Sequence, residues 1–175
     1  MTRYFDPLTA VGDDREAFKG RWEDRLWLNV PGPLYGADTD NCWTGRLHAP
    51  AHVLYGGEHA SEYVYRQPRT PAETARLVEA ARADPFACYA CDGDAWWTSD
   101  LVREWWRGRA RITEYLTGRS DEWAEFDARS GQGIVAAVRD FEAYIADGLA
   151  TDLRVYLYWL EERRSPGGDD RLPVL

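Results

Sequence analysis

The feature that most constrains the fold is a long apolar repeat in the last third of the chain. Hydrophobic residues recur there at helical spacing, and the members of the repeat are Ile134, Val138, Phe141, Ile145, Leu149, Tyr156 and Leu160. One helix over residues 133–164 would span about 45 Å, at about 1.5 Å per residue. Gly148 lies inside this range, where glycine costs about 1 kcal/mol relative to alanine. The repeat therefore predicts one long helix, or two helices that meet at Gly148.

Capping signals place two further helices. The run Thr70-Pro71-Ala72-Glu73 combines a capping hydroxyl, a proline at the first helical position and a glutamate that can reach back to the cap. It predicts a helix that ends at about Ala83. Thr98 or Ser99 is expected to cap another helix that runs to about Leu116. The expected apolar face of that helix consists of Leu101, Trp105, Ile112 and Leu116.

Two weaker helical signals complete the helical part of the prediction. Phe18, Trp22 and Leu26 recur every four residues, which indicates a helix over residues 13–29 that ends before the proline-rich segment at 31–33. A short helix is expected at 121–129, after a glycine and a serine.

The remaining segments predict a small sheet and two long loops. Residues 52–55 and 62–65 are rich in β-branched and aromatic side chains and flank two glycines, a pattern typical of a β-hairpin. Residues 31–51 and 84–98 are irregular. We therefore expect a mainly α (α+β) fold of about five helices, a small β-hairpin and two long loops. Residues 1–175 are expected to form a single domain, with 165–175 as an extended C-terminal tail.

Composition excludes several classes of function. The net charge of −9 argues against nucleic acid and against an anionic membrane surface, and it favours a basic protein partner. A membrane-spanning helix requires about 18 apolar residues, and the sequence contains no stretch of that kind. The N-terminus has no secretory signature, so we expect a cytoplasmic protein. The sequence contains no P-loop, no dinucleotide-binding glycine motif and no nucleophile elbow, so nucleotide binding or serine-type catalysis on those scaffolds has no support, and the sequence leans against an enzyme without deciding the question.

The cysteines suggest an alternative function. Cys88 and Cys91 form a CxxC pair, and Cys42 with one of His48, His52 or His59, His48 being the first choice, could complete a set of four metal ligands. This alternative is a zinc or iron–sulfur protein, or a metal-dependent enzyme that also uses the histidine and aspartate loops. Thiol–disulfide exchange at the CxxC pair is a further interpretation. The plain structural interpretation is that these are ordinary, partly buried cysteines, and no cofactor is then required.

Aromatic and acidic residues are concentrated in the two expected loops. Exposed tryptophan beside carboxylates is typical of a protein-binding surface. The candidate partner-binding residues are Tyr35, Asp38, Asp40, Trp43, Asp92, Asp94, Trp96 and Trp97. Two alternatives stay open from the sequence. The rings could fill the core instead, and the pairs Asp38/Asp40 and Asp92/Asp94 could bind a cation or act as acid and base.

Three segments carry a resemblance to a protein family. They are the run from Asn29 to Gly45, the run Tyr65-Arg66-Gln67-Pro68-Arg69-Thr70, and Asp92-Gly93-Asp94 followed by Trp97-Thr98. Together they resemble an uncharacterised family of actinobacterial proteins, some of which are labelled ferredoxin. The resemblance implies no established activity. A cluster-binding ferredoxin uses four cysteine ligands, whereas this chain has three cysteines, so a histidine would have to replace one of them.

These observations favour a non-catalytic protein-binding module. Its most concrete form is an immunity-type inhibitor of a basic toxin domain, by analogy with small acidic immunity proteins. Acidic groups would steer the encounter and aromatic side chains would anchor it. The protein is expected to be a monomer, or a homodimer formed through the long C-terminal helix.

Overall fold

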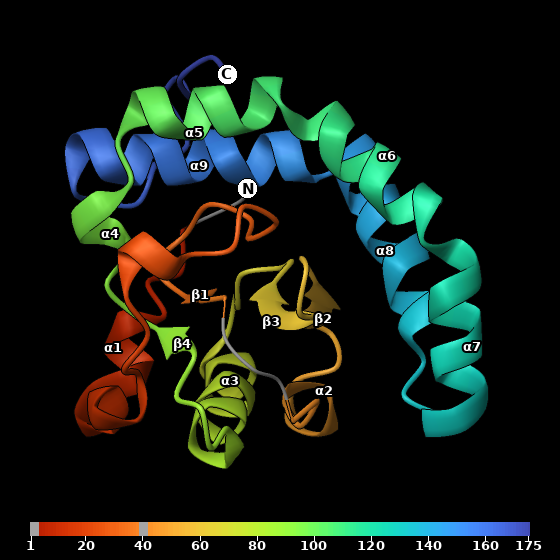
Figure 1. Ribbon diagram of the computed structural model, residues 1–175. Coiled ribbons are helices and arrows are strands. Elements are labelled where there is room, and N and C mark those ends of the chain that lie inside the picture. Colours follow the sequence, from red (N-terminus) through yellow and green to blue (C-terminus); the bar gives the residue numbers. More distant parts are fainter. Residues whose placement is uncertain (1–3, 39–41) are drawn as a thin grey trace. The chain divides into compact units, whose positions relative to one another are not determined.

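The structure of the chain is a computed structural model that describes residues 4–38 and 42–175. Over these residues the chain has nine α-helices and two two-stranded antiparallel sheets, and it is therefore mainly α (α+β), as predicted (Figure 1). It divides into an N-terminal unit, Phe5–Trp96, and a C-terminal unit that consists of Trp97–Leu175 and Tyr4. The single domain stays a prediction, because a division into units does not measure whether they fold independently.

The C-terminal unit is a two-layered helical assembly. One layer contains α5 (Ser99–Arg107), α6 (Arg109–Gly118) and α7 (Ser120–Ser130), and the other contains α8 (Ile134–Ala146) and α9 (Leu149–Glu162). Helix α5 packs on α9, and α6 and α7 pack on α8 (Figure 1). The buried apolar residues of this unit include Val102, Ile112, Leu116, Trp123, Phe126, Ile134, Phe141, Leu149 and Leu153. Leu101, which we expected on the buried face, is exposed, and Val102 is buried next to it.

Both layers are interrupted at a glycine. Residues 133–164 form two helices rather than one, because Gly148 adopts a φ of +107°, a conformation that side-chain-bearing residues rarely adopt. Gly108 separates α5 from α6, so the helix expected from residue 98 to 116 is also divided. The homodimer prediction assumed a long C-terminal helix that the structure shows as two shorter ones, and the oligomeric state stays a prediction. No helix in the described ranges has the length and apolarity that crossing a membrane requires.

The C-terminal tail, residues 165–175, contains no helix or strand, and arginine side chains hold its last residues in place. The Arg154 guanidinium donates hydrogen bonds to the carbonyl oxygens of Pro173 at 2.7 Å and Leu172 at 3.1 Å. Arg103 on α5 donates to the carbonyl oxygen of Val174 at 2.9 Å. Backbone carbonyls that lack a regular partner are thus satisfied by charged donors.

The N-terminal unit contains both sheets and the best-predicted helix. Strands β2 (Val53–Gly56) and β3 (Ser61–Val64) form the expected hairpin, with Val53 opposite Val64. Helix α3 (Pro71–Ala83) begins where the capping signal places it, because the Thr70 hydroxyl accepts the backbone N–H of Glu73 at 3.2 Å. Three short helices complete the unit: α1 (Leu8–Val11), α2 (Gly45–His48) and α4 (Gly93–Trp96).

The helix expected over residues 13–29 is not formed, so that prediction is wrong. The segment contains 3-10 turns at Gly12–Ala17 and Trp22–Asp24 and is otherwise irregular. Its backbone pairs with distant parts of the unit instead: Gly20 donates to the carbonyl of Tyr89 at 2.8 Å and Leu26 to that of Gly36 at 3.1 Å. A backbone that already has such partners gains nothing from helical hydrogen bonds.

Two amide side chains hold the segment around residue 35 in place. Asn29 is fully buried; its Nδ2 donates to Leu26 O at 2.7 Å and Gly36 O at 2.8 Å, and its Oδ1 accepts from the backbone of Gly36 and Val64. Gln67 Nε2 donates to Leu34 O at 2.7 Å. Both residues belong to the segments that carry the family resemblance, and here they support the backbone of the segment that contains Tyr35.

Candidate functional site

The two long irregular segments meet in the N-terminal unit. Residues 35–36 form strand β1 (Tyr35–Gly36), which pairs with β4 (Tyr89–Ala90) so that Tyr35 is opposite Ala90. The pairing continues on both sides, since Ala37 donates to Cys88 O at 2.9 Å and Gly93 to Pro33 O at 3.0 Å. Candidate residues that are more than fifty positions apart in the sequence therefore lie side by side.

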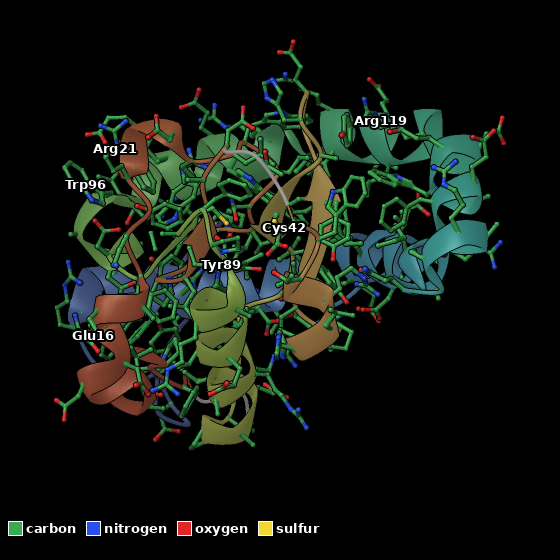
Figure 2. All side chains as sticks on the ribbon, turned by 60° about the horizontal axis from the view of Figure 1, so that its bottom comes forward. Glu16, Arg21, Cys42, Tyr89, Trp96 and Arg119 are labelled. Carbon is green, nitrogen blue, oxygen red and sulfur yellow. The ribbon has the colours of Figure 1, made fainter. Side chains whose placement is uncertain are left out.

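A carboxylate links the candidate residues of the two segments. Asp92 Oδ1 accepts the Tyr35 hydroxyl at 2.7 Å, and Oδ2 accepts the indole N–H of Trp96 at 2.9 Å. Asp92 and Trp96 are four residues apart across α4, a spacing that places two side chains on the same helix face. Trp96 is 44% exposed, whereas Tyr35 is fully buried. Figure 2 shows Trp96 at the periphery of the side chains and Tyr89 in the interior.

Trp22 completes this group of side chains. Its ring lies parallel to that of Trp96, with 6.1 Å between centroids and 11° between planes, and it meets the Tyr35 ring edge-on at 5.6 Å. The Arg25 guanidinium lies 4.4 Å from the centroid of Trp22, a cation–π contact. We call Trp22, Tyr35, Asp92 and Trp96 the tryptophan–aspartate patch.

Burial changes the acid–base properties of two groups at the patch. Burial, reinforced by the hydrogen bond to Asp92, raises the pKa of Tyr35, so its hydroxyl remains a donor at neutral pH. Burial lowers the pKa of Arg25, and the charge on that guanidinium lies against the face of Trp22. The patch thus has a buried hydroxyl that donates to Asp92 and a cation against the ring of Trp22. These groups fix the position of Trp96, and none of them has the form of a nucleophile paired with a base.

An acidic groove lies beside the patch in the N-terminal unit. Its volume is about 360 Å³, and it is lined by Glu23, Asp24, Arg25, Leu26, Trp27 and Asp38. Asp38, one of the candidate partner-binding residues, accepts the Ser61 hydroxyl at 2.6 Å and lies 3.7 Å from His59 Nδ1. The groove therefore connects Asp38 to Arg25, which contacts the patch.

The other candidate residues are distributed differently. Asp94 is half-buried on α4, and its charge helps to raise the pKa of Asp6, for which burial is the main cause. Trp97 is only 5% exposed and therefore offers little surface to a partner. Trp43 is 41% exposed, but it belongs to the segment that leads into α2. Asp40 lies outside the described residues.

A buried carboxylate positions the segment that carries Trp43. Glu62 Oε1 accepts the backbone N–H of Gly45 at 2.9 Å, and Oε2 accepts the hydroxyl of the fully buried Tyr89. A Cβ atom at Gly45 would lie 2.2 Å from the oxygens of both side chains, so only glycine fits there. Burial raises the pKa of Glu62. This arrangement is structural, because both oxygens of the carboxylate are bonded to groups of the protein itself.

The cysteines do not form the expected ligand set. Cys88 is buried, Cys91 is half-buried and Cys42 is exposed. The two residues between Cys88 and Cys91 form strand β4, and side chains three positions apart on an extended chain project to opposite faces. A metal site would need three or more His, Cys, Asp or Glu side chains close together. Within residues 4–38 and 42–175 there is no such group, with His48 or without it. The geometry thus gives zinc or iron–sulfur binding no support, and that hypothesis stays a prediction.

Trp22 and Arg25 belong to the site but were not among the candidates predicted from the sequence. Trp22 was assigned to the buried stripe of a helix that does not form. The run Arg21-Trp22-Glu23-Asp24-Arg25 contains four charged residues around one tryptophan, which is unusual for a buried helical turn and was the available signal.

Comparison of the chain with protein-family models, curated proteins and solved structures gave no match. The function is therefore inferred from the geometry of the site.

Proposed function

We propose that the chain is a non-catalytic protein-binding module whose N-terminal unit binds a basic segment of a partner protein through the tryptophan–aspartate patch. The observation that supports this proposal is the state of Trp96. Its side chain is 44% exposed, yet its indole N–H is bonded to Asp92 and its ring is stacked on Trp22. A large aromatic side chain that is both exposed and held in position is typical of a binding hot spot.

The rigidity of Trp96 lowers the cost of association. Fixing a mobile side chain at an interface costs about 0.5–1.5 kcal/mol. Trp96 has already lost much of that freedom, because a hydrogen bond and a ring contact restrain it in the free protein. A partner that covers the ring can therefore gain the free energy of apolar burial with a small loss of entropy.

Charge selects the kind of partner. The N-terminal unit contains 15 acidic and 9 basic residues, a net charge of −6, which is most of the charge of the whole chain. Exposed Asp92 is bonded to Trp96, exposed Glu23 follows Trp22 in the sequence, and the acidic groove adds Asp24 and Asp38. Such a surface accelerates the encounter with a basic protein and disfavours an acidic one.

The most concrete form of this function is an immunity-type inhibitor that blocks a basic toxin domain by occlusion. Inhibition by occlusion requires no catalytic groups on the inhibitor. The support for this specific form is the size and the negative charge of the chain, together with the exposed aromatic anchor.

Site-specific photo-cross-linking tests the proposal. Ala95 is exposed and precedes Trp96 on α4, and Ala75 is exposed on α3 of the same unit. A photoreactive benzophenone amino acid would replace each of them in turn in the full chain, expressed in its native host. We expect the probe at position 95 to form one strong cross-link to a basic protein, which mass spectrometry would identify, and the probe at position 75 to form none.

The partner so identified is then purified and mixed with the unlabelled protein. A 1:1 complex that weakens as salt is added supports the proposal, because screening reduces the attraction between opposite charges. The absence of a cross-link from position 95, or the same cross-links from positions 95 and 75, would contradict it.

A further inference from the structure

We infer that the partner contacts Trp96 with an arginine side chain, whose guanidinium stacks on the face of the indole opposite Trp22. This inference rests on the proposed function, and it specifies the chemistry of the contact. Trp96 makes contacts within the protein through its indole N–H and through one side of its ring. The rest of the ring determines which chemical group of a partner can bind there.

The polar edge of Trp96 is already occupied within the protein. Its Nε1 donates to Asp92 Oδ2 at 2.9 Å, and indole has no other conventional hydrogen-bonding group. Trp22 lies nearly parallel to Trp96 but offset from it, with 6.1 Å between centroids and 11° between planes, so it overlaps one ring face only in part. The side chain is 44% exposed, and we take the opposite ring face as the surface that a partner contacts, where only π electrons and apolar area are on offer.

The electrostatics of that face favour a cation. The face of an aromatic ring carries the negative part of the quadrupole, and tryptophan binds cations more strongly than tyrosine or phenylalanine. The protein itself uses the same contact at Trp22, where Arg25 lies 4.4 Å from the ring centroid, and in the C-terminal unit, where Arg109 lies 3.9 Å from the Trp106 centroid. An arginine on Trp96 would add a second cation–π contact to the patch.

Asp92 favours arginine over lysine at this position. Its two oxygens accept hydrogen bonds from Tyr35 and from Trp96, whereas an ionised carboxylate has about four acceptor sites. A guanidinium is planar, weakly hydrated and has five N–H donors, so it can lie on a ring and donate from its edge to a nearby carboxylate. An ammonium group is a strongly hydrated point charge and gains less from the flat ring.

Two capped peptides of equal length and charge test the inference. One contains three arginines separated by glycine, and the other contains three lysines in their place. Each is titrated into the full-length ¹⁵N-tryptophan-labelled protein, and the indole signal of Trp96, identified from its absence in Trp96→Phe, is followed by NMR. Phe86 is 45% exposed in the same unit, so Phe86→Ala is a matched control for Trp96→Ala.

We expect the arginine peptide to bind about 3-fold more tightly than the lysine peptide, with the largest shift at Trp96. This preference should disappear in Trp96→Ala and persist in Phe86→Ala. Equal affinity of the two peptides, a preference that survives Trp96→Ala, or no binding of either peptide at millimolar concentration would overturn the inference. The proposed function fails separately, when the probe at position 95 captures no partner. If the probe at position 95 captures a partner but the two peptides bind with equal affinity, only the assignment of arginine is contradicted.

Discussion

Asp92 and Trp96, four residues apart across α4, are joined by a hydrogen bond of 2.9 Å from the indole nitrogen to Oδ2. The same carboxylate accepts the hydroxyl of Tyr35, which lies 57 positions away in the sequence. A buried phenol therefore fixes a carboxylate, and the carboxylate fixes an exposed indole. The position of the proposed anchor thus depends on a residue that no partner can reach.

Replacement of Tyr35 by phenylalanine should loosen Trp96 without removing it. Tyr35→Phe leaves the buried ring in place but deprives Asp92 Oδ1 of its donor, so the free energy of unfolding should fall by about 2 kcal/mol. The relaxation of the Trp96 indole ¹⁵N signal should also show faster motion. Urea unfolding and NMR measure the two effects.

Tyr144→Phe is the control for this prediction. The Tyr144 hydroxyl donates to Asp152 at 2.5 Å in the C-terminal unit, so the control removes a similar phenol–carboxylate bond elsewhere. It should reduce stability by a comparable amount and leave Trp96 unchanged. A Trp96 signal that is equally rigid in Tyr35→Phe and wild type would show that the phenol does not position the anchor.

A methyl group at Gly36 should disrupt the N-terminal unit. A Cβ atom there would lie 1.9 Å from the carbonyl oxygen of Glu62, because β1 passes directly against β3. We expect Gly36→Ala to cost about 3 kcal/mol or to prevent folding, as measured by denaturant unfolding.

Gly118→Ala is the contrasting variant. A Cβ atom at Gly118 would have open space around it, with no other described side chain or distant backbone within 4 Å. Alanine is also the better helix former, so stability should rise by up to about 1 kcal/mol. Equal effects of the two substitutions would contradict the close approach of β1 and β3.

Glu62 should give the protein a distinctive pH dependence. Glu62→Gln removes an acceptor from either Gly45 or Tyr89, so the free energy of unfolding at neutral pH should fall by about 2 kcal/mol.

Burial raises the pKa of Glu62 in the folded protein above its ordinary value of 4.5. The folded state therefore binds this proton first, and the contribution of Glu62 to stability increases as the pH falls through its raised pKa. As the pH falls through the raised pKa of Glu62, the free energy of unfolding of wild type should increasingly exceed that of Glu62→Gln. A difference that does not change with pH would contradict a buried Glu62 that is ionised at neutral pH.

His52 should have the opposite pH dependence. Burial lowers its pKa below 6.5, and its Nδ1 lies 2.9 Å from the carbonyl oxygen of Arg66, which can only accept. The unfolded chain binds the proton first, so His52 destabilises the folded protein as the pH falls below about 6.5. His52→Asn keeps a donor and cannot titrate, so the loss of stability in acid should be smaller than in wild type. Urea unfolding of wild type and His52→Asn over a series of pH values measures the two slopes.

Local signals predicted those parts of the fold that depend on neighbouring residues. The cap at Thr70, the cap at Thr98 and the paired runs around Gly56 lie within a few residues of the structure they specify, and all three are confirmed. The helix around Trp22 is wrong because Gly20 and Leu26 bond to Tyr89 and Gly36, partners that spacing cannot reveal. Periodicity identified an apolar stripe but could not show that its backbone was already paired.

The candidate site was predicted in part for the same reason. Asp92 and Trp96 were identified because tryptophan in an acidic loop is typical of a binding surface, whereas the short helix α4 that places them one turn apart was not predicted. Tyr35 was identified as well, but as a contact residue, whereas it supports Asp92 from the interior. Trp22 and Arg25 join the site only through the tertiary structure, which brings Trp22 to 6.1 Å from Trp96. The sequence identified residue types in two loops, but it could not reveal a ring contact between residues 74 positions apart.

The dissociation constant of the cross-linked partner, measured by calorimetry for two matched variants, tests the central claim most directly. Trp96 and Phe86 are exposed to nearly the same extent, 44% and 45%, and differ in that Trp96 belongs to the tryptophan–aspartate patch. We predict that Trp96→Ala weakens binding by about 30-fold, the effect of losing a hot spot of about 2 kcal/mol, while Phe86→Ala changes it by less than about 2-fold. Equal dissociation constants for the two variants would contradict the claim that Trp96 anchors a partner.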